Sequence, residues 1–186
     1  MDKLFSSEYV RLLIFSLFIS FIAYGFPLTN FSIAIDSEQQ FGPDISLSLG
    51  RWGTNLLRYH IFNGITPYFT LLFSLIVFSF AAVELTKLFR FSHLLSYIFC
   101  GIFLTFPQMA YQFAFTMQAD VAALGFLTSA LAVKYFIRSH ENGFSLKSSA
   151  YFILSALIFM FTIGLYQALG FIPIVIYLII FFQRTY

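Results

Sequence analysis

Charged residues are scarce in this chain: 10% of its 186 residues are Asp, Glu, Lys or Arg, whereas 60% are hydrophobic. No water-soluble domain could bury its 28 Phe and 11 Tyr residues, so a lipid bilayer is the natural solvent. The net charge of +2 is small and the basic residues are scattered, which indicates no nucleic-acid partner. Cys100 is the only cysteine, so an internal disulfide is excluded and a cysteine metal site is disfavoured.

Motifs of the common soluble enzymes are also missing. The sequence has no nucleophile elbow, no phosphate-binding glycine loop and no dinucleotide fingerprint. Its three histidines, His60, His93 and His140, are far apart in the chain, so we assign no metal triad. We therefore expect no cofactor and no metal centre, although a divalent cation bound by carboxylates stays open.

Long apolar runs are what the chain does contain. Several reach the roughly 20 residues that a helix needs to cross a hydrocarbon core of about 30 Å. These runs lack the alternation of barrel strands, so the predicted fold is an all-α polytopic membrane bundle. We expect a single transmembrane domain over residues 1–186 with six spans, at about 10–30, 65–85, 94–109, 121–137, 148–164 and 168–182.

The connections between these runs carry most of the polar residues. An outer loop at 33–63 follows the first span, and apolar residues within it recur at spacings that suit a short helix along the membrane surface. A polar interval at 108–120 is expected to turn the chain after the third span. The last apolar run is too long for one span, so we expect a tight hairpin that turns at 165–167.

Basic residues predict the orientation of the bundle. With the N-terminus in the cytoplasm, only Arg51 and Arg58 of the ten basic residues lie on the outer side. The outer loop, Asp120 and the 165–167 turn then share the outer face. A bundle could bring them around one cavity.

Two carboxylates, Asp36 and Glu38, follow the first span directly. At this spacing one carboxylate can accept a proton from an attacking hydroxyl while the other orients it or holds a divalent cation. The alternative interpretation is a solvated acidic loop. Asp120 is a third candidate carboxylate, and it could equally be the N-cap of the fourth span.

Substrate contacts have their own candidates. Arg51 and Arg58 are suited to a phosphate, or they anchor the loop at the membrane interface together with Trp52. Gln118 and Gln167 stand near the outer ends of spans, where their amides suit sugar hydroxyls or are satisfied by water or by the backbone. Tyr166 adjoins Gln167 in the predicted turn.

Four motifs in order carry a resemblance: IDSE at 35–38, SLGRWG at 48–53, FTMQAD at 115–120 and GLYQA at 164–168. Together they resemble the serotype-converting glucosyltransferases of bacterial O-antigen modification, which belong to the GT-C class of membrane glycosyltransferases. The resemblance implies transfer of glucose or a related hexose from a polyprenyl-phosphate donor to lipid-linked O-antigen. It implies a multi-pass protein of the bacterial inner membrane with its active face in the periplasm.

The same resemblance implies roles for single residues. The acidic motif of the first outer loop maps onto Asp36 and Glu38, Asp120 is a candidate supporting carboxylate, and the candidate substrate contacts are Arg51, Trp52, Arg58, Gln118, Tyr166 and Gln167. Such enzymes are longer than this chain. We therefore expect the N-terminal part of an enzyme, completed by further helices or by a second chain.

A non-catalytic membrane component is the alternative function. Such a component could be a subunit of a lipid-linked sugar flippase or an inactive fragment. A transporter more often carries ionisable residues within its spans, whereas the middle of these spans is almost free of them. That distribution favours chemistry at the membrane interface.

Overall fold

The computed structural model describes residues 7–30, 43–64, 66–115, 118–141 and 145–185. Its regular structure in these ranges is helical, with no strand, which confirms the predicted all-α fold. Five helices are long and apolar enough to cross a membrane, and a bent pair raises this to six. Asp36 and Glu38 lie outside the described residues.

The chain forms two compact units, which are described separately below. The first unit contains Met1–Gln39 and Thr66–Ala123, and the second contains Gln40–Ile65 and Leu124–Tyr186. The boundary therefore falls inside one long helix, α7 (Ala119–Glu141). Residues of the predicted outer loop fall in both units. The single transmembrane domain over residues 1–186 stays a prediction.

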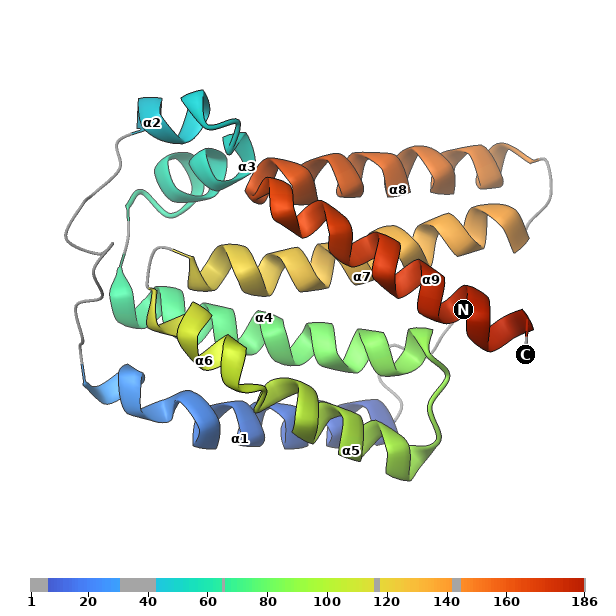
Figure 1. Ribbon diagram of the computed structural model, residues 1–186, viewed down its shortest axis with the longest axis horizontal. Helices are drawn as coiled ribbons and strands as arrows, with labels where there is room; N and C mark the ends of the chain where they lie inside the picture. Colours follow the sequence, from blue (N-terminus) through green and yellow to red (C-terminus); the bar gives the residue numbers. More distant parts are fainter. Residues whose placement is uncertain (1–6, 31–42, 65, 116–117, 142–144, 186) are drawn as a thin grey trace. The chain divides into compact units, whose positions relative to one another are not determined.

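Four helices make up most of the first unit: α1 (Ser7–Thr29), α4 (Pro67–Leu88), α5 (His93–Leu104) and α6 (Pro107–Ala114). Figure 1 shows α1, α4 and α5 side by side. Ser20 on α1 and Ser79 on α4 form a buried hydrogen bond of 2.9 Å, and Phe15 on α1 packs on Tyr97 of α5. Close packing through small hydroxyl residues is typical of helices in membranes.

An aromatic cluster fills the centre of the first unit. Phe78 is fully buried, and its ring centre lies 4.8 Å from Phe103 and 5.3 Å from Phe113. Tyr24 of α1 meets Phe113 edge to face at 4.9 Å. Part of the unusual phenylalanine content is thus packing between helices, not only lipid-facing surface.

The third apolar run differs from its prediction. We expected one span to 109 and a polar turn over 108–120, but α5 ends at Leu104 and α6 begins at Pro107, with a bend of 47° between them. Proline is well tolerated at the first position of a helix, where no N–H is needed. Pro107 therefore starts a new helix, and much of the expected polar turn is helical.

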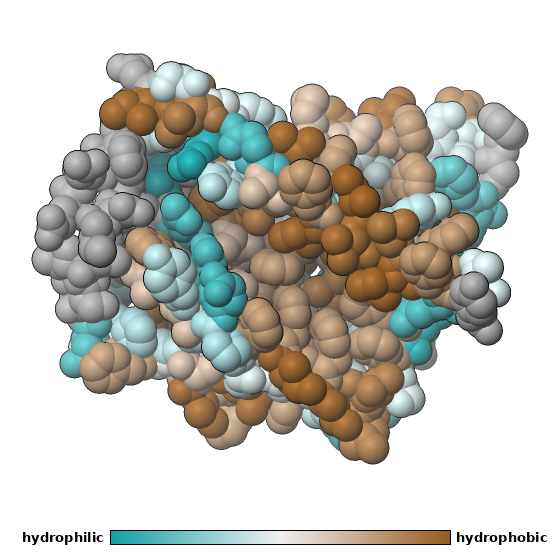
Figure 2. Space-filling model, in the orientation of Figure 1, coloured by the Kyte–Doolittle hydropathy of each residue, from teal (hydrophilic) through white to brown (hydrophobic). Residues whose placement is uncertain are grey.

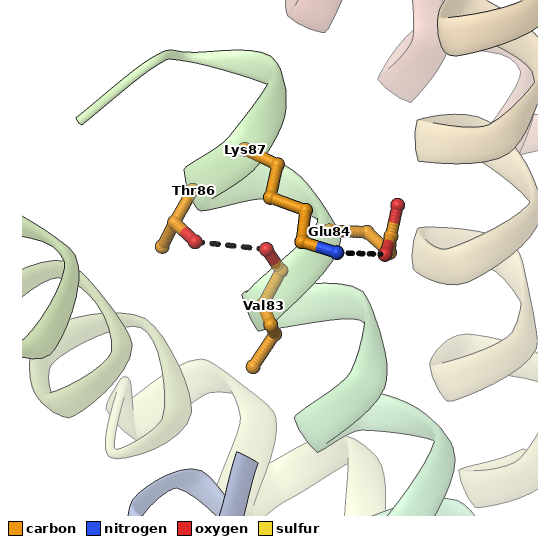
Figure 3. Close-up of polar contacts among 4 residues, drawn as sticks. All are labelled: Val83, Glu84, Thr86 and Lys87. Carbon is orange, nitrogen blue, oxygen red and sulfur yellow. Dashed lines mark hydrogen bonds and ion pairs between the residues drawn. The ribbon is translucent and has the colours of Figure 1, made fainter. Parts of the chain in front are cut away.

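Glu84 and Lys87 form an ion pair near the end of α4. Figure 3 shows the ammonium group of Lys87 directed at the Glu84 carboxylate, and the two atoms are 3.3 Å apart. Lys87 also lies over the ring of Tyr9, 3.7 Å from its centre. Because Glu84 is buried, these contacts keep a charged group tolerable at the end of an apolar helix.

The second unit contains the rest of α7 and six further elements: α2 (Pro43–Ser48), α3 (Trp52–Asn55), the π-helix η2 (Leu56–Ile61), α8 (Leu146–Leu165), the 3-10 helix η3 (Gln167–Gly170) and α9 (Phe171–Thr185). Tyr166 adopts an extended conformation between α8 and η3. The last apolar run therefore reverses within 165–167, where the hairpin was predicted.

Hydroxyl side chains join α7 and α8 along an antiparallel seam. Thr162 donates to the Thr128 hydroxyl at 2.8 Å, and Ser155 donates to the carbonyl of Ala132 at 2.7 Å. At the other end of the seam Arg184 of α9 pairs with Glu141 of α7 at 3.3 Å. Within this unit the helices reverse direction as consecutive membrane spans must.

Apolar side chains remain exposed on the outward faces of several helices. Figure 2 shows hydrophobic surface, in brown, over α5 and over α9. Leu94 of α5 and Phe171 of α9 are 70% and 71% exposed. Such faces suit contact with lipid, as expected of a membrane protein.

Candidate functional site

The structure brings four of the predicted site residues together in the second unit: Arg51, Trp52, Tyr166 and Gln167. The first pair begins α3, and the second pair follows α8. The two segments are more than a hundred residues apart in sequence. Their contact is the best-defined candidate site in the described part of the chain.

Gly50 terminates α2 just before the site residues Arg51 and Trp52. Its φ of 71° lies in the left-handed region, which glycine adopts without strain. Two backbone hydrogen bonds close the helix end, from Gly50 to Leu47 and from Arg51 to Ser46, both 2.9 Å. This is the usual glycine-terminated helix end, and it turns the chain so that α3 begins directly after Arg51.

The α3 segment is fastened to the C-terminal end of α8. The Thr54 hydroxyl donates to the main-chain carbonyl of Leu165 at 2.6 Å, and Thr54 is 4% exposed. The last carbonyls of a helix have no partner within the helix, so Thr54 satisfies one of these buried acceptors. A Cβ on Gly53 would lie 2.9 Å from the backbone of Gly164, so only glycine allows this approach.

Trp52 lies across Gly164. A Cβ on Gly164 would come within 2.3 Å of the indole ring, and Phe161 meets the ring edge to face at 5.8 Å. The indole is nevertheless 40% exposed. One face of Trp52 is thus held by α8 while the rest of the ring remains available for contact.

Arg51 lies over the ring of Tyr166, with its guanidinium carbon 4.6 Å from the ring centre. Its Nε atom is buried and has no hydrogen-bond partner among the described residues. A cation–π contact stabilises the charge but uses none of the guanidinium N–H donors. Arg51 therefore keeps the capacity to bind an anion.

Gln167 also supports this arrangement. Its side-chain amide nitrogen donates to the carbonyl of Leu49, immediately before Gly50. One of the groups predicted to bind a sugar hydroxyl is therefore used in joining η3 to the loop. The amide oxygen accepts no hydrogen bond in the described structure and could accept one from a substrate.

Arg58 is 6% exposed and lies on the π-helix η2. This burial does not suit the proposed interfacial anchor, which keeps its guanidinium in contact with water and headgroups. Arg58 has an interaction partner within the protein. Single π-helical turns are frequent at functional sites because they alter which side chains point inward.

Asp120 and Gln118 belong to the first unit. Asp120 is 2% exposed, lies in the first turn of α7 and accepts a hydrogen bond of 2.9 Å from the N–H of Val121. A carboxylate is favourable at this end of a helix. The helix begins at Ala119, so Asp120 stands inside the first turn and is not the N-cap.

No group of three or more His, Cys, Asp or Glu side chains that could hold a metal ion occurs among the residues that the structure describes. The acidic pair at 36 and 38 stands outside that set. The contacts of Gly53, Thr54 and Gly164 were not predicted. The only sequence signal for Gly53 and Gly164 was their position inside the SLGRWG and GLYQA motifs, and Thr54 directly follows the first of these.

The sequence model of the glucosyl transferase GtrII family matches residues 25–186, which is most of the chain. The protein belongs to the GtrII glucosyl transferase family. Membership implies a glycosyltransferase and confirms the resemblance drawn from the four motifs. No curated protein and no solved structure matches the chain.

In this GtrII chain two of the four motifs are in direct contact. SLGRWG supplies Arg51 and Trp52, which contact Tyr166 and Gly164 of GLYQA. Gln167 of GLYQA donates to the carbonyl of Leu49 in SLGRWG. A transferase that releases a charged leaving group needs a cation for it, and this contact leaves the buried Nε of Arg51 without an acceptor among the described residues. The assembled motifs are therefore the strongest candidate for a substrate-binding site.

Proposed function

We propose that this chain transfers glucose or a related hexose from a polyprenyl-phosphate donor to lipid-linked O-antigen, at the periplasmic face of the bacterial inner membrane. Family membership supports the sugar and the reaction class. The observation that carries the donor assignment is Arg51, a cation with a buried Nε and no described acceptor. A phosphate is the natural partner of such a group.

The proposed reaction divides between acid–base and phosphate-binding groups. Asp36 accepts the proton of the acceptor hydroxyl while the oxygen of that hydroxyl bonds to the anomeric carbon of the sugar. The bond between that carbon and the phosphate oxygen breaks, and Arg51 stabilises the charge on the departing polyprenyl phosphate. Glu38 orients the acceptor hydroxyl, and Asp120 supports the carboxylates.

Other polar residues contribute binding. Arg58 assists with the donor phosphate, Trp52 and Tyr166 form a surface for the sugar or the prenyl chain, and the amides of Gln118 and Gln167 face sugar hydroxyls. A second chain that supplies further helices is part of the proposal, since GT-C enzymes carry more spans than this chain.

Sugar transfer in membrane vesicles tests the proposal. The vesicles contain the chain with any partner chain, and receive polyprenyl-phosphate-linked radioactive glucose and lipid-linked O-antigen. We expect Asp36→Asn to lower transfer by at least about a hundredfold, the usual contribution of a general base. Asp44→Asn is the matched control, because it removes the same charge from the same loop, and it should retain transfer.

Three outcomes contradict the scheme. Full transfer by Asp36→Asn excludes Asp36 as the base. Donor binding or translocation without transfer, insensitive to Asp36→Asn and Glu38→Gln, indicates the non-catalytic flippase-like component instead. Labelling of a cysteine placed at position 36 only from the cytoplasmic side excludes a periplasmic site.

A further inference from the structure

The surroundings of Arg51 indicate what kind of anion it binds. Large apolar side chains on the neighbouring segments are exposed, among them Leu47 at 52%, Leu49 at 49% and Leu56 at 41%. An exposed apolar surface around a guanidinium does not suit a fully hydrated ion. It suits an anion attached to an apolar chain at the membrane interface.

Arg51 cannot hold this position by its own contacts. Its one described side-chain interaction is the contact with the Tyr166 ring, which fixes distance better than direction. The backbone of Arg51 is the N-cap of α3, a helix of only four residues that has little stability alone. The position of the guanidinium therefore depends on whatever fastens α3 to the rest of the unit.

Thr54 makes that attachment. Its hydroxyl donates to the Leu165 carbonyl, the residue immediately before Tyr166. Together with the hydrogen bond from Gln167 to the Leu49 carbonyl, this bond fastens the segment that carries the guanidinium to the segment that carries the aromatic ring, and it is the one of the two made from within α3. Because both Thr54 and Leu165 are buried, water cannot replace this bond when the hydroxyl is removed.

We infer that Thr54 is a positioning residue of a lipid-phosphate site: its hydrogen bond to Leu165 holds Arg51 beside Tyr166, where the guanidinium takes up the phosphate of a prenyl-linked donor. The inference deepens the proposed function and rests on it for the identity of the donor. Thr54 itself touches no substrate in this scheme. It acts through the geometry of Arg51.

The chain provides its own probe for this site. Trp52 is the only tryptophan in the sequence, it directly follows Arg51, and its indole is partly exposed. Tryptophan emission therefore reports on the site alone in the purified protein. Binding is measured by titrating protein in detergent micelles, which add no tryptophan, with a short-chain polyprenyl phosphate that carries no sugar, with prenyl alcohol and inorganic phosphate as separate arms.

Three variants separate positioning from general stability. Thr54→Val keeps the shape but loses the hydroxyl, and we expect about tenfold weaker binding of polyprenyl phosphate, the usual effect of one lost buried hydrogen bond. Thr54→Ser restores the donor and should bind nearly as wild type. Ser155→Ala is the matched control, since it removes another buried hydroxyl-to-carbonyl bond of this unit, on the α7–α8 seam, and should leave binding unchanged.

The transfer assay gives a second readout. Thr54→Val should raise the donor KM by the same factor while the acceptor KM stays constant, because only donor positioning changes. Wild-type affinity in Thr54→Val, or equal losses in Thr54→Val and Ser155→Ala, would overturn the inference. Equal responses to prenyl alcohol or to inorganic phosphate would overturn the lipid-phosphate ligand.

The inference and the proposed function fail in different ways. If the fluorescence pattern holds and the vesicles transfer no sugar, the proposed transferase is wrong and the positioning role of Thr54 stands. If the vesicles transfer sugar and Thr54→Val changes neither the affinity nor the donor KM, the positioning role is wrong and the transferase stands.

Discussion

Lys87 in the first unit and Arg51 in the second both lie over tyrosine rings, and among the described residues Lys87 also has a carboxylate partner whereas Arg51 has none. Lys87 in the first unit lies 3.7 Å from the ring centre of Tyr9 and pairs with Glu84 at 3.3 Å. Arg51 in the second unit lies 4.6 Å from the ring centre of Tyr166, and its buried Nε has no described acceptor. The same aromatic contact thus serves a satisfied ion pair and an unsatisfied cation.

This difference separates a structural charge from a binding charge. Burying one member of an ion pair is tolerable only when its partner remains, so Lys87 stabilises Glu84 at the end of α4. Arg51 neutralises no carboxylate among the described residues and instead stands among exposed apolar side chains. The comparison therefore predicts that removal of Arg51 affects donor binding and transfer, whereas removal of Lys87 affects the stability of the fold.

The largest expected effect comes from Arg51→Gln. Loss of the charge should lower the transfer rate with subsaturating donor by about a hundredfold or more, because a charge-assisted contact to phosphate is lost where charge develops. Lys87→Gln should leave donor kinetics unchanged and lower the free energy of unfolding by about 1 kcal/mol, since Lys87 is partly exposed. Donor kinetics and thermal melting of both variants measure this dissociation. A loss of donor affinity in Lys87→Gln would break the comparison.

A smaller effect is expected from Gly164→Ala. The added methyl group would overlap the Trp52 indole, so the ring must move, at a cost of about 1 to 3 kcal/mol in unfolding free energy. The emission of Trp52 should shift at the same time. Gly101→Ala in α5 of the first unit is the control, because a Cβ there meets nothing within 4 Å. Equal melting temperatures for Gly164→Ala and wild type would show that the α3–α8 contact is loose.

The smallest effect is expected at Tyr166. Tyr166→Leu removes the ring below Arg51 and should weaken polyprenyl-phosphate binding by roughly three- to tenfold, the range of a partly desolvated cation–π contact. Tyr166→Phe keeps the ring and should bind as wild type, which isolates the aromatic contact from the hydroxyl. Tyr9→Leu, the equivalent change in the first unit, should not alter binding. If Tyr166→Phe and Tyr166→Leu weaken binding equally, the hydroxyl and not the ring supports Arg51.

Much of the secondary structure could be predicted because it depends on local properties. The lengths and hydropathy of the apolar runs are sufficient to indicate membrane helices, and polar Gln167 with its neighbouring glycines marked the last reversal. The third run was the exception. Pro107 was taken as the end of a helix, whereas the helix had already ended at Leu104 and Pro107 begins the next one.

The candidate site could be predicted only in part. Arg51, Trp52, Tyr166 and Gln167 were found through their motifs, and the predicted orientation placed the loop and the 165–167 turn on one face, but the sequence did not indicate which residues of the two motifs touch. Thr54 escaped notice because a hydroxyl residue in a loop carries no periodic signal. Its partner is a main-chain carbonyl 111 residues away, which no side-chain pattern reveals.

The sequence alone determined the solvent of this protein and the helices that cross it, because hydropathy and length add up residue by residue along the chain. The tertiary structure decided which cation is satisfied and which is left for a ligand. Lys87 meets the carboxylate of Glu84 one turn away on its own helix, whereas folding brings Arg51 to an aromatic ring from the far end of the sequence and to no carboxylate among the described residues. The energy of an electrostatic contact is largest within a few ångströms and decreases with distance. Such proximity between distant parts of the sequence is a property of the fold.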